Sequence, residues 1–168
     1  MKVIFKKAVV GDLETFFALF QKNVQANFPE YSPKITRFIA EKEYTLLDTK
    51  AQFQAGIISI YLAFLGKEII GFLMTRFLGG GVMLAEWLSV SECYQSRGIG
   101  TLLLRFWEKD AKKSGIHMLH LWADERVKKF YQKNGWQLLG RVPENFYGVD
   151  DYFLYKKIQQ PKLKNFLQ

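Results

Sequence analysis

The sequence has little cysteine, histidine or proline: its 168 residues include one cysteine, two histidines and four prolines. With Cys93 alone, no internal disulfide can form, which fits a reducing cytoplasm. No apolar run approaches the roughly 20 residues that a membrane-spanning helix needs. The first residues also lack the apolar stretch and cleavage site of a signal peptide. We therefore expect a cytoplasmic protein with no membrane partner.

The composition is that of a packed globular protein, with 49% hydrophobic and 16% aromatic residues. The length suits one domain with a sizeable core, and the chain shows no repeat, low-complexity tract or linker. The net charge of +8 favours anionic partners. However, the positive charges are spread along the chain and no nucleic-acid-binding module is evident, so we expect no nucleic-acid partner. The densest basic cluster lies at the C-terminus, so we predict a domain over residues 1–158 and a basic tail over 159–168.

Hydrophobic periodicity predicts a single α/β domain with a mixed sheet. Asp12 is placed to cap the first helix, and Ser32 precedes Pro33 at the start of a second helical stretch. Gly66-Lys67 and the glycines at 79–81 indicate turns within a three-stranded meander. We expect helices at 13–24, from 33, at 98–114 and at 124–135, and strands at 3–10, 57–65, 68–78, 82–90, 116–123, 136–142 and 151–158.

The stretch Gln95-Ser96-Arg97-Gly98-Ile99-Gly100 leads into a predicted helix. The apolar positions of that helix are spaced to form one face and are Ile99, Leu102, Leu103, Phe106 and Trp107. The first amides of a helix have no partner within it and carry partial positive charge, so a phosphate can bind there. Thr101-Leu102 after Gly100 does not match a Walker loop, and Leu103 replaces the third glycine of a dinucleotide fingerprint. Taken alone, the stretch is either an anion site or an ordinary strand-to-helix turn.

Two motifs about thirty residues apart resemble those of the GNAT superfamily of N-acetyltransferases. The first is Gln95-x-x-Gly98-x-Gly100 after the segment EWLSVSECY, and the second is KKFYQKNGWQLLGR about thirty residues later. The resemblance implies the GNAT fold, a mostly antiparallel mixed sheet of about seven strands with about four helices. It also implies an acetyl-CoA-dependent acyltransferase, specifically an N-acetyltransferase that transfers acetyl directly to a primary amine in a ternary complex. The amine would belong to a small molecule, a peptide or a protein.

The resemblance also implies the residues that bind the acyl donor. In the family, backbone amides of this loop hold the pyrophosphate, and the preceding strand pairs its backbone with the pantetheine arm. The side chains of Leu88 and Val90 are expected to pack in the core, so their part would be played by the backbone. The implied acetyl-CoA-binding residues are Leu88, Ser89, Val90, Gln95, Ser96, Arg97, Gly98, Ile99, Gly100 and Thr101.

Two residues match positions that transfer protons in the family. Glu86 is the only acid in the strand MLAEWLSV, where burial would make its carboxylate a stronger proton acceptor; the alternative is a solvent-facing glutamate. Tyr131 matches the family's general acid beside the CoA sulfur; the alternative is aromatic packing beside Phe130. The amine must lose a proton before attack and the departing thiolate must gain one, so a base and an acid are both required.

The chain departs from the family pattern at Asp124, where an asparagine is common. This departure motivates an alternative function, a CoA-binding sensor or regulatory module without useful catalysis. Tyr147 and Asp150 in the last hairpin are weaker candidates for acceptor binding. His117 and His120 have an odd spacing in a strand and face opposite sides, so we expect no metal site. We expect a monomer or a homodimer.

Overall fold

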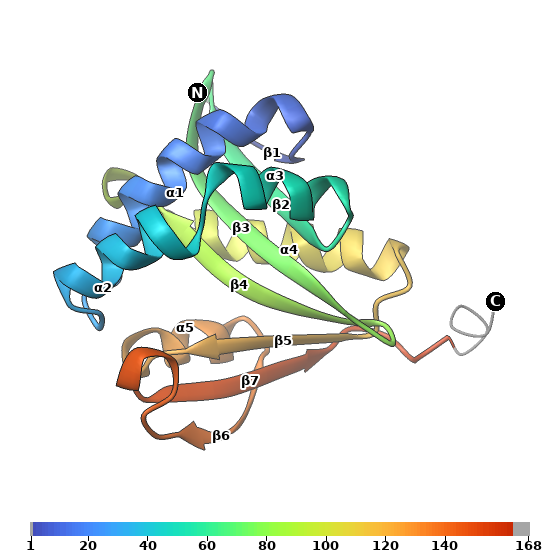
Figure 1. Ribbon diagram of the computed structural model, residues 1–168. Helices are drawn as coiled ribbons and strands as arrows, with labels where there is room; N and C mark the ends of the chain where they lie inside the picture. Colours follow the sequence, from blue (N-terminus) through green and yellow to red (C-terminus); the bar gives the residue numbers. More distant parts are fainter. Residues whose placement is uncertain (1, 163–168) are drawn as a thin grey trace. The chain divides into compact units, whose positions relative to one another are not determined.

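The computed structural model describes residues 2–162 and contains seven strands and five α-helices, with shorter helical turns between them (Figure 1). The strands form one sheet in the order β1-β2-β3-β4-β5-β7-β6. The predicted single α/β domain with a mixed sheet is therefore confirmed. The strands are β1 (Val3–Lys7), β2 (Ile58–Leu65), β3 (Glu68–Gly79), β4 (Val82–Val90), β5 (Met118–Ala123), β6 (Gln137–Val142) and β7 (Asp151–Lys157).

The helices differ from the predicted number because the second helical stretch is divided. A π-helical turn at Ile39–Glu43 ends it, and a new helix begins after Thr45, whose side chain accepts a hydrogen bond from Asp48 N at 3.1 Å. The predicted helix start at Ser32-Pro33 is confirmed, with Pro33 in the first turn, and the Ser32 hydroxyl caps it by accepting from Ile35 N. The helices are α1 (Leu13–Asn27), α2 (Pro33–Phe38), α3 (Leu46–Gln54), α4 (Ile99–Lys113) and α5 (Glu125–Lys133).

The predicted capping role of Asp12 was wrong in detail. Asp12 occupies the N-cap position of α1, but its side chain makes no capping bond to that helix. Its carboxylate instead accepts from Val9 N and from Lys6 Nζ, each at 2.8 Å. The Asp12 carboxylate therefore binds Lys6 and the Val9 amide and not the first amides of α1. These bonds hold the turn between β1 and α1 in place.

The pairing of the strands is mixed. β1 runs antiparallel to β2, from Val3 opposite Leu65 to Lys7 opposite Tyr61. β4 runs parallel to β5, with a register from Val82 opposite Met118 to Ala85 opposite Leu121. β7 is antiparallel to both β5 and β6, and the β6–β7 ladder is irregular between Leu138 and Gly140.

The chain divides into two compact units, which are described separately below. The first unit comprises Met1–Thr75 and Trp87–Phe106, and the second comprises Arg76–Glu86 and Trp107–Gln168. β3, β4 and α4 each continue from one unit into the other.

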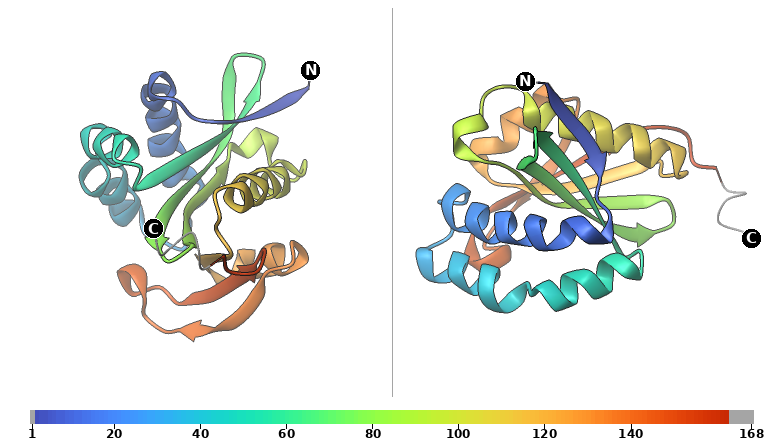
Figure 2. Two further views of the ribbon diagram at one scale, coloured as in Figure 1. Left: turned by 90° about the vertical axis from the view of Figure 1, so that its right-hand side faces the viewer. Right: turned by 90° about the horizontal axis from the view of Figure 1, so that it is seen from above.

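In the first unit, α1 lies beside the run from α2 to α3, and the core forms between α1 and strands β2 and β3 (Figures 1 and 2). One face of α1 is buried and includes Phe16 and Phe20. Phe20 contacts the rings of Tyr44, Phe72 and Trp87, with centroids 5.2–5.9 Å apart. The helix is therefore bound to the sheet by burial of aromatic side chains.

In the second unit, the core lies between strands β5 and β7 and the later part of α4. Leu119, Leu121 and Leu154 are fully buried, and the ring of Trp107 stacks on that of Trp136 with centroids 6.0 Å apart. The apolar face predicted for α4 is confirmed except at Leu102, which is exposed, whereas Leu104 is buried instead.

No helix among residues 2–162 is both long enough and apolar enough to cross a membrane. Of the predicted basic tail, residues 163–168 lie outside the described part of the chain, so the predicted boundary near residue 158 stays a prediction.

We predict that Phe20→Ala destabilises the fold by about 3–5 kcal/mol, because it removes a fully buried ring and leaves a cavity. Urea unfolding should measure this loss. Phe38→Ala is the matched control in the same unit, since Phe38 is 51% exposed and its loss should cost under about 0.5 kcal/mol. Equal costs for the two variants would contradict the assignment of the core.

Candidate functional site

The loop before α4 is built around two left-handed residues. Ser96 has φ 58° and Gly98 has φ 79°, a region that glycine enters without steric cost and other residues seldom occupy. Leu102 N donates to Gly98 O at 3.0 Å, so Gly98 is the last residue before the helix. The loop therefore turns the chain sharply and starts α4 at Ile99.

The start of α4 has the features of an anion site. The amides of Ile99, Gly100 and Thr101 lie in the first turn, where helix geometry provides no intrahelical acceptor. A Cβ placed on Gly98 would meet no atom within 4 Å, so the backbone faces open space. Gly98 fits the predicted close approach of a ligand to the backbone. Gly100 differs, because it is an ordinary helical residue with no positive φ.

The end of β4 presents its backbone in alternating directions. Ser91 N donates to Ile70 O on β3 at 2.9 Å, so the carbonyl of Val90, on the other side of that trans peptide, points away from β3. By strand alternation the backbone groups of Leu88 and Val90 share this outward direction, whereas those of Ser89 face β3. Of the three residues predicted to pair their backbone with the pantetheine arm, only Leu88 and Val90 therefore have backbone groups that face away from β3.

Arg97, which was predicted mainly as a backbone position, has a placed side chain. Its guanidinium lies over the ring of Tyr94, 5.7 Å from the centroid. The Tyr94 hydroxyl in turn donates to Glu68 Oε2 at 3.1 Å. A cation at this exposed loop adds positive potential near the amides of α4.

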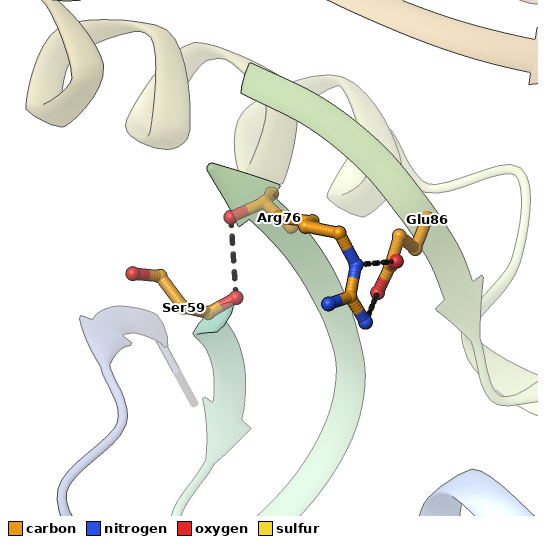
Figure 3. Close-up of polar contacts among 4 residues, drawn as sticks. Ser59, Arg76 and Glu86 are labelled. Carbon is orange, nitrogen blue, oxygen red and sulfur yellow. Dashed lines mark hydrogen bonds and ion pairs between the residues drawn. The ribbon is translucent and has the colours of Figure 1, made fainter. Parts of the chain in front are cut away.

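Glu86 lies in the second unit and is not an isolated buried acid. Its carboxylate forms an ion pair with Arg76 of β3, in which Nε donates to Oε1 and an Nη atom lies 3.5 Å from Oε2 (Figure 3). The carboxylate is largely buried, with 12% of the side chain exposed. The burial expected for the Glu86 carboxylate is therefore present and the solvent-facing alternative is wrong, whereas its role in proton transfer stays a prediction.

Tyr131 is also in the second unit, on α5, and is buried with 8% exposed. Its ring contacts those of Phe130 and Trp136 at 5.0 and 6.1 Å. Burial, together with the nearby carboxylate of Asp124, raises the pKa of the Tyr131 phenol well above its ordinary value. The aromatic packing expected as the alternative is therefore present, and the hydroxyl stays protonated throughout the neutral range.

Asp124 caps α5, since its Oδ1 accepts from Arg126 N at 2.6 Å. Its other oxygen pairs with the guanidinium of Arg126 at 3.0 Å. The negative charge that replaces the asparagine of the family pattern is thus partly balanced by its neighbour in the same helix.

The two weaker candidates in the last hairpin have different environments. Tyr147 is exposed and left-handed, with φ 57°. Asp150 pairs with Arg141 and accepts from Glu144 N at 3.0 Å, and the hydrogen bond from Arg141 is the main cause that lowers its pKa. A cationic acceptor would have to displace Arg141 to reach this carboxylate.

The histidines show no metal-binding arrangement. His120 packs against Phe153 with ring centroids 5.0 Å apart, and burial lowers its pKa. Among residues 2–162 no group of three or more His, Cys, Asp or Glu side chains is placed to hold a metal ion.

Comparisons with known proteins connect these features to a family. Residues 57–138 match the model of the acetyltransferase (GNAT) domain. The PaiA N-acetyltransferase of Thermoplasma acidophilum in complex with coenzyme A superposes with a TM-score of 0.75 at 24% identity, over 94% of this chain and 99% of that one. Residues 57–138 of this chain thus match the GNAT acetyltransferase domain, and the fold around them is the GNAT fold.

Two further structures share the GNAT fold. The ribosomal-protein-S18-alanine N-acetyltransferase of Escherichia coli has a TM-score of 0.71 at 17% identity, covering 96% of this chain and 97% of that one. YncA of Salmonella typhimurium, solved with its cofactor acetyl-CoA, has a TM-score of 0.76 at 12% identity, with coverage of 96% and 97%. No curated protein matches the chain by sequence.

The sequence interpretation missed two residues that contact predicted site residues. Arg76 pairs with Glu86, and the sequence signal was a single basic residue in the otherwise apolar run of β3. Asn27 donates to Ser89 Oγ and to Val90 O from the end of α1. No sequence pattern links positions 27 and 90, so only the fold could place them together.

We predict that Gly98→Ala lowers the stability by about 1–2 kcal/mol, because a side chain at φ 79° strains the backbone. Chemical denaturation should show this loss. Gly140→Ala serves as control, since Gly140 is not left-handed and a Cβ there meets no atom within 4 Å. An unchanged stability of the Gly98 variant would argue against the loop conformation.

Proposed function

We propose that the protein is an acetyl-CoA-dependent N-acetyltransferase that transfers an acetyl group directly to a primary amine in a ternary complex. The observation that carries the proposal is the Gly98 loop at the start of α4, with open space at the glycine and unpaired helix amides beside it. The family and the coenzyme A and acetyl-CoA complexes among its structural neighbours support the same donor. The single cysteine is the ground for placing it in a reducing cytoplasm.

The donor would be held by backbone groups. The amides of residues 95–101 would bind the pyrophosphate, and the outward backbone of Leu88 and Val90 would pair with the pantetheine arm. Uncharged amides at a helix start suit a phosphate because they are oriented before it binds. Arg97, held over Tyr94, would add positive charge on the exposed side of the loop.

An amine that is charged at neutral pH must first lose one proton, and its nitrogen then attacks the thioester carbonyl. As the carbon–sulfur bond breaks, the nitrogen loses a second proton and the thiolate gains one, so the reaction releases one proton overall. Tyr131 would supply the proton to sulfur, since its raised pKa keeps it protonated at neutral pH. Glu86 would accept the amine proton, directly or through water, but only after its contact with Arg76 loosens. Tyr147 and Asp150 remain candidates for contact with the acceptor.

The first test is the donor itself. Calorimetric titration with acetyl-CoA should give 1:1 binding, because the amides at the start of α4 are preorganised for pyrophosphate. A thiol-release assay against amino acids, polyamines, aminoglycosides and short peptides should then identify the acceptor class. The absence of binding at millimolar acetyl-CoA would end the proposal. Binding without thiol release for any amine would instead favour a CoA-binding regulatory module.

We predict that Tyr131→Phe lowers kcat by about 10²–10⁴-fold and leaves the affinity for acetyl-CoA nearly unchanged, as loss of a general acid does. Because the pKa of Tyr131 is raised, the wild-type rate should show no fall from this group below pH 10. Steady-state kinetics over pH 6–9.5 should check both points. Tyr61→Phe is the control, since Tyr61 is equally buried but lies on β2. An unchanged kcat in Tyr131→Phe would remove this residue from the mechanism.

A further inference from the structure

The carbonyl oxygen of Val90 is bound by two side-chain amides that come from distant parts of the sequence. Asn27 Nδ2, at the last residue of α1, donates to it at 3.1 Å. Gln95 Nε2, at the start of the glycine loop, donates to it at 2.9 Å. A strand carbonyl that faces away from its partner strand is thus held by groups that are not part of the sheet.

Asn27 uses its amide group twice. Besides Val90 O, its Nδ2 donates to Ser89 Oγ at 2.9 Å, and Ser89 is buried with 4% exposed. The two acceptors belong to consecutive residues at the end of β4, so one asparagine fixes both the side chain and the main chain there. An amide has two hydrogens, and this geometry places both on β4.

The same peptide group is also fixed from the opposite side. Ser91 N donates to Ile70 O at 2.9 Å. A Cβ on Gly71 would lie 3.1 Å from Ser89 O and 3.2 Å from Val90 Cγ2, so the absence of a side chain there lets β3 approach closely. The Val90–Ser91 peptide is therefore restrained by α1 and the loop on one edge and by β3 on the other.

We propose that Asn27 is a positioning residue for the acyl donor, acting with Gln95 through the Val90 carbonyl. Their shared hydrogen bonds orient the Val90–Ser91 peptide and, through the extended backbone of Val90, the N–H of Val90, which points to the same side as its carbonyl. They also set the point where the glycine loop leaves the strand. The Val90 carbonyl is thereby occupied, so the donor contacts this residue through its N–H alone. This inference rests on the proposed function, because it assumes that β4 and the loop hold acetyl-CoA.

The arrangement has a specific energetic consequence. Either amide alone can satisfy the carbonyl, so each single replacement leaves one donor in place. Loss of both leaves no side chain to hold the carbonyl, so the peptide loses its whole restraint on this edge of the strand. The effects of the two replacements on donor affinity are therefore expected to exceed the product of the single effects.

The experiment measures coenzyme A affinity by calorimetry in Asn27→Ala, Gln95→Ala and the double variant. We expect each single variant to bind about 2–10-fold more weakly and the double variant about 100-fold or more. Asn27→Asp, which keeps the shape but replaces the donor with an acceptor, should bind more weakly than Asn27→Ala. Multiplicative effects in the double variant, or wild-type affinity in both singles, would overturn the inference.

The matched control is Gln21→Ala. Gln21 also lies on α1 and also holds a backbone carbonyl, donating from Nε2 to Ala40 O at 2.8 Å, but it does not contact β4. This variant should lose stability in thermal unfolding without losing affinity for coenzyme A. Equal losses of affinity in the Gln21 and Asn27 variants would assign Asn27 a general structural role and overturn the proposal.

A measurement on the wild-type protein covers the case in which an Asn27 variant does not fold. On addition of coenzyme A, the side-chain amide NMR signals of Asn27 and Gln95 should shift, while that of Gln21 should stay in place. Static signals for Asn27 and Gln95 in a protein that binds coenzyme A would refute the inference alone. If the wild-type protein does not bind coenzyme A at all, the proposed function fails instead.

Discussion

The orientation of one peptide group, between Val90 and Ser91, determines the structure at the end of β4. Its N–H donates to Ile70 O in the sheet. Its carbonyl accepts hydrogen bonds from Asn27 of α1 and from Gln95 of the loop. Because a trans peptide is planar, fixing one end fixes the other. The outward direction of the Val90 carbonyl and the point where the loop leaves the strand are therefore set together.

The loop then leads from the end of β4 into the first turn of α4. Two left-handed residues, Ser96 and Gly98, reverse the chain within a few residues, and Gly98 O accepts the first bond of α4. A β-branched or bulky residue at Gly98 would oppose this turn and would also fill the open space beside it. The glycine thus meets a conformational requirement of the fold and leaves the backbone accessible, and these two properties cannot be separated by sequence alone.

Local sequence signals were sufficient for the elements and for the motif, but not for long-range polar contacts. Ser32-Pro33 predicted a helix start because capping depends on adjacent residues. The α3 start was missed because its buried face is weak, with Thr49 buried and Leu47 exposed. Asn27 carries no comparable signal, since its partners are 62 and 63 residues away and its role depends on how α1 packs on the sheet. The ion pair between Arg76 and Glu86 likewise could not be predicted from the sequence alone.

The two candidate proton-transfer groups have opposite environments. Tyr131 is surrounded by aromatic rings that disfavour its charged form, whereas the charge of Glu86 is matched by Arg76. Positioning of reactants can supply much of the rate of a bimolecular transfer. For the proposed reaction, the largest contribution of this chain would then come from how rigidly β4 and its loop hold the acyl donor. That rigidity depends on the contacts of the Val90 carbonyl with Asn27 and Gln95.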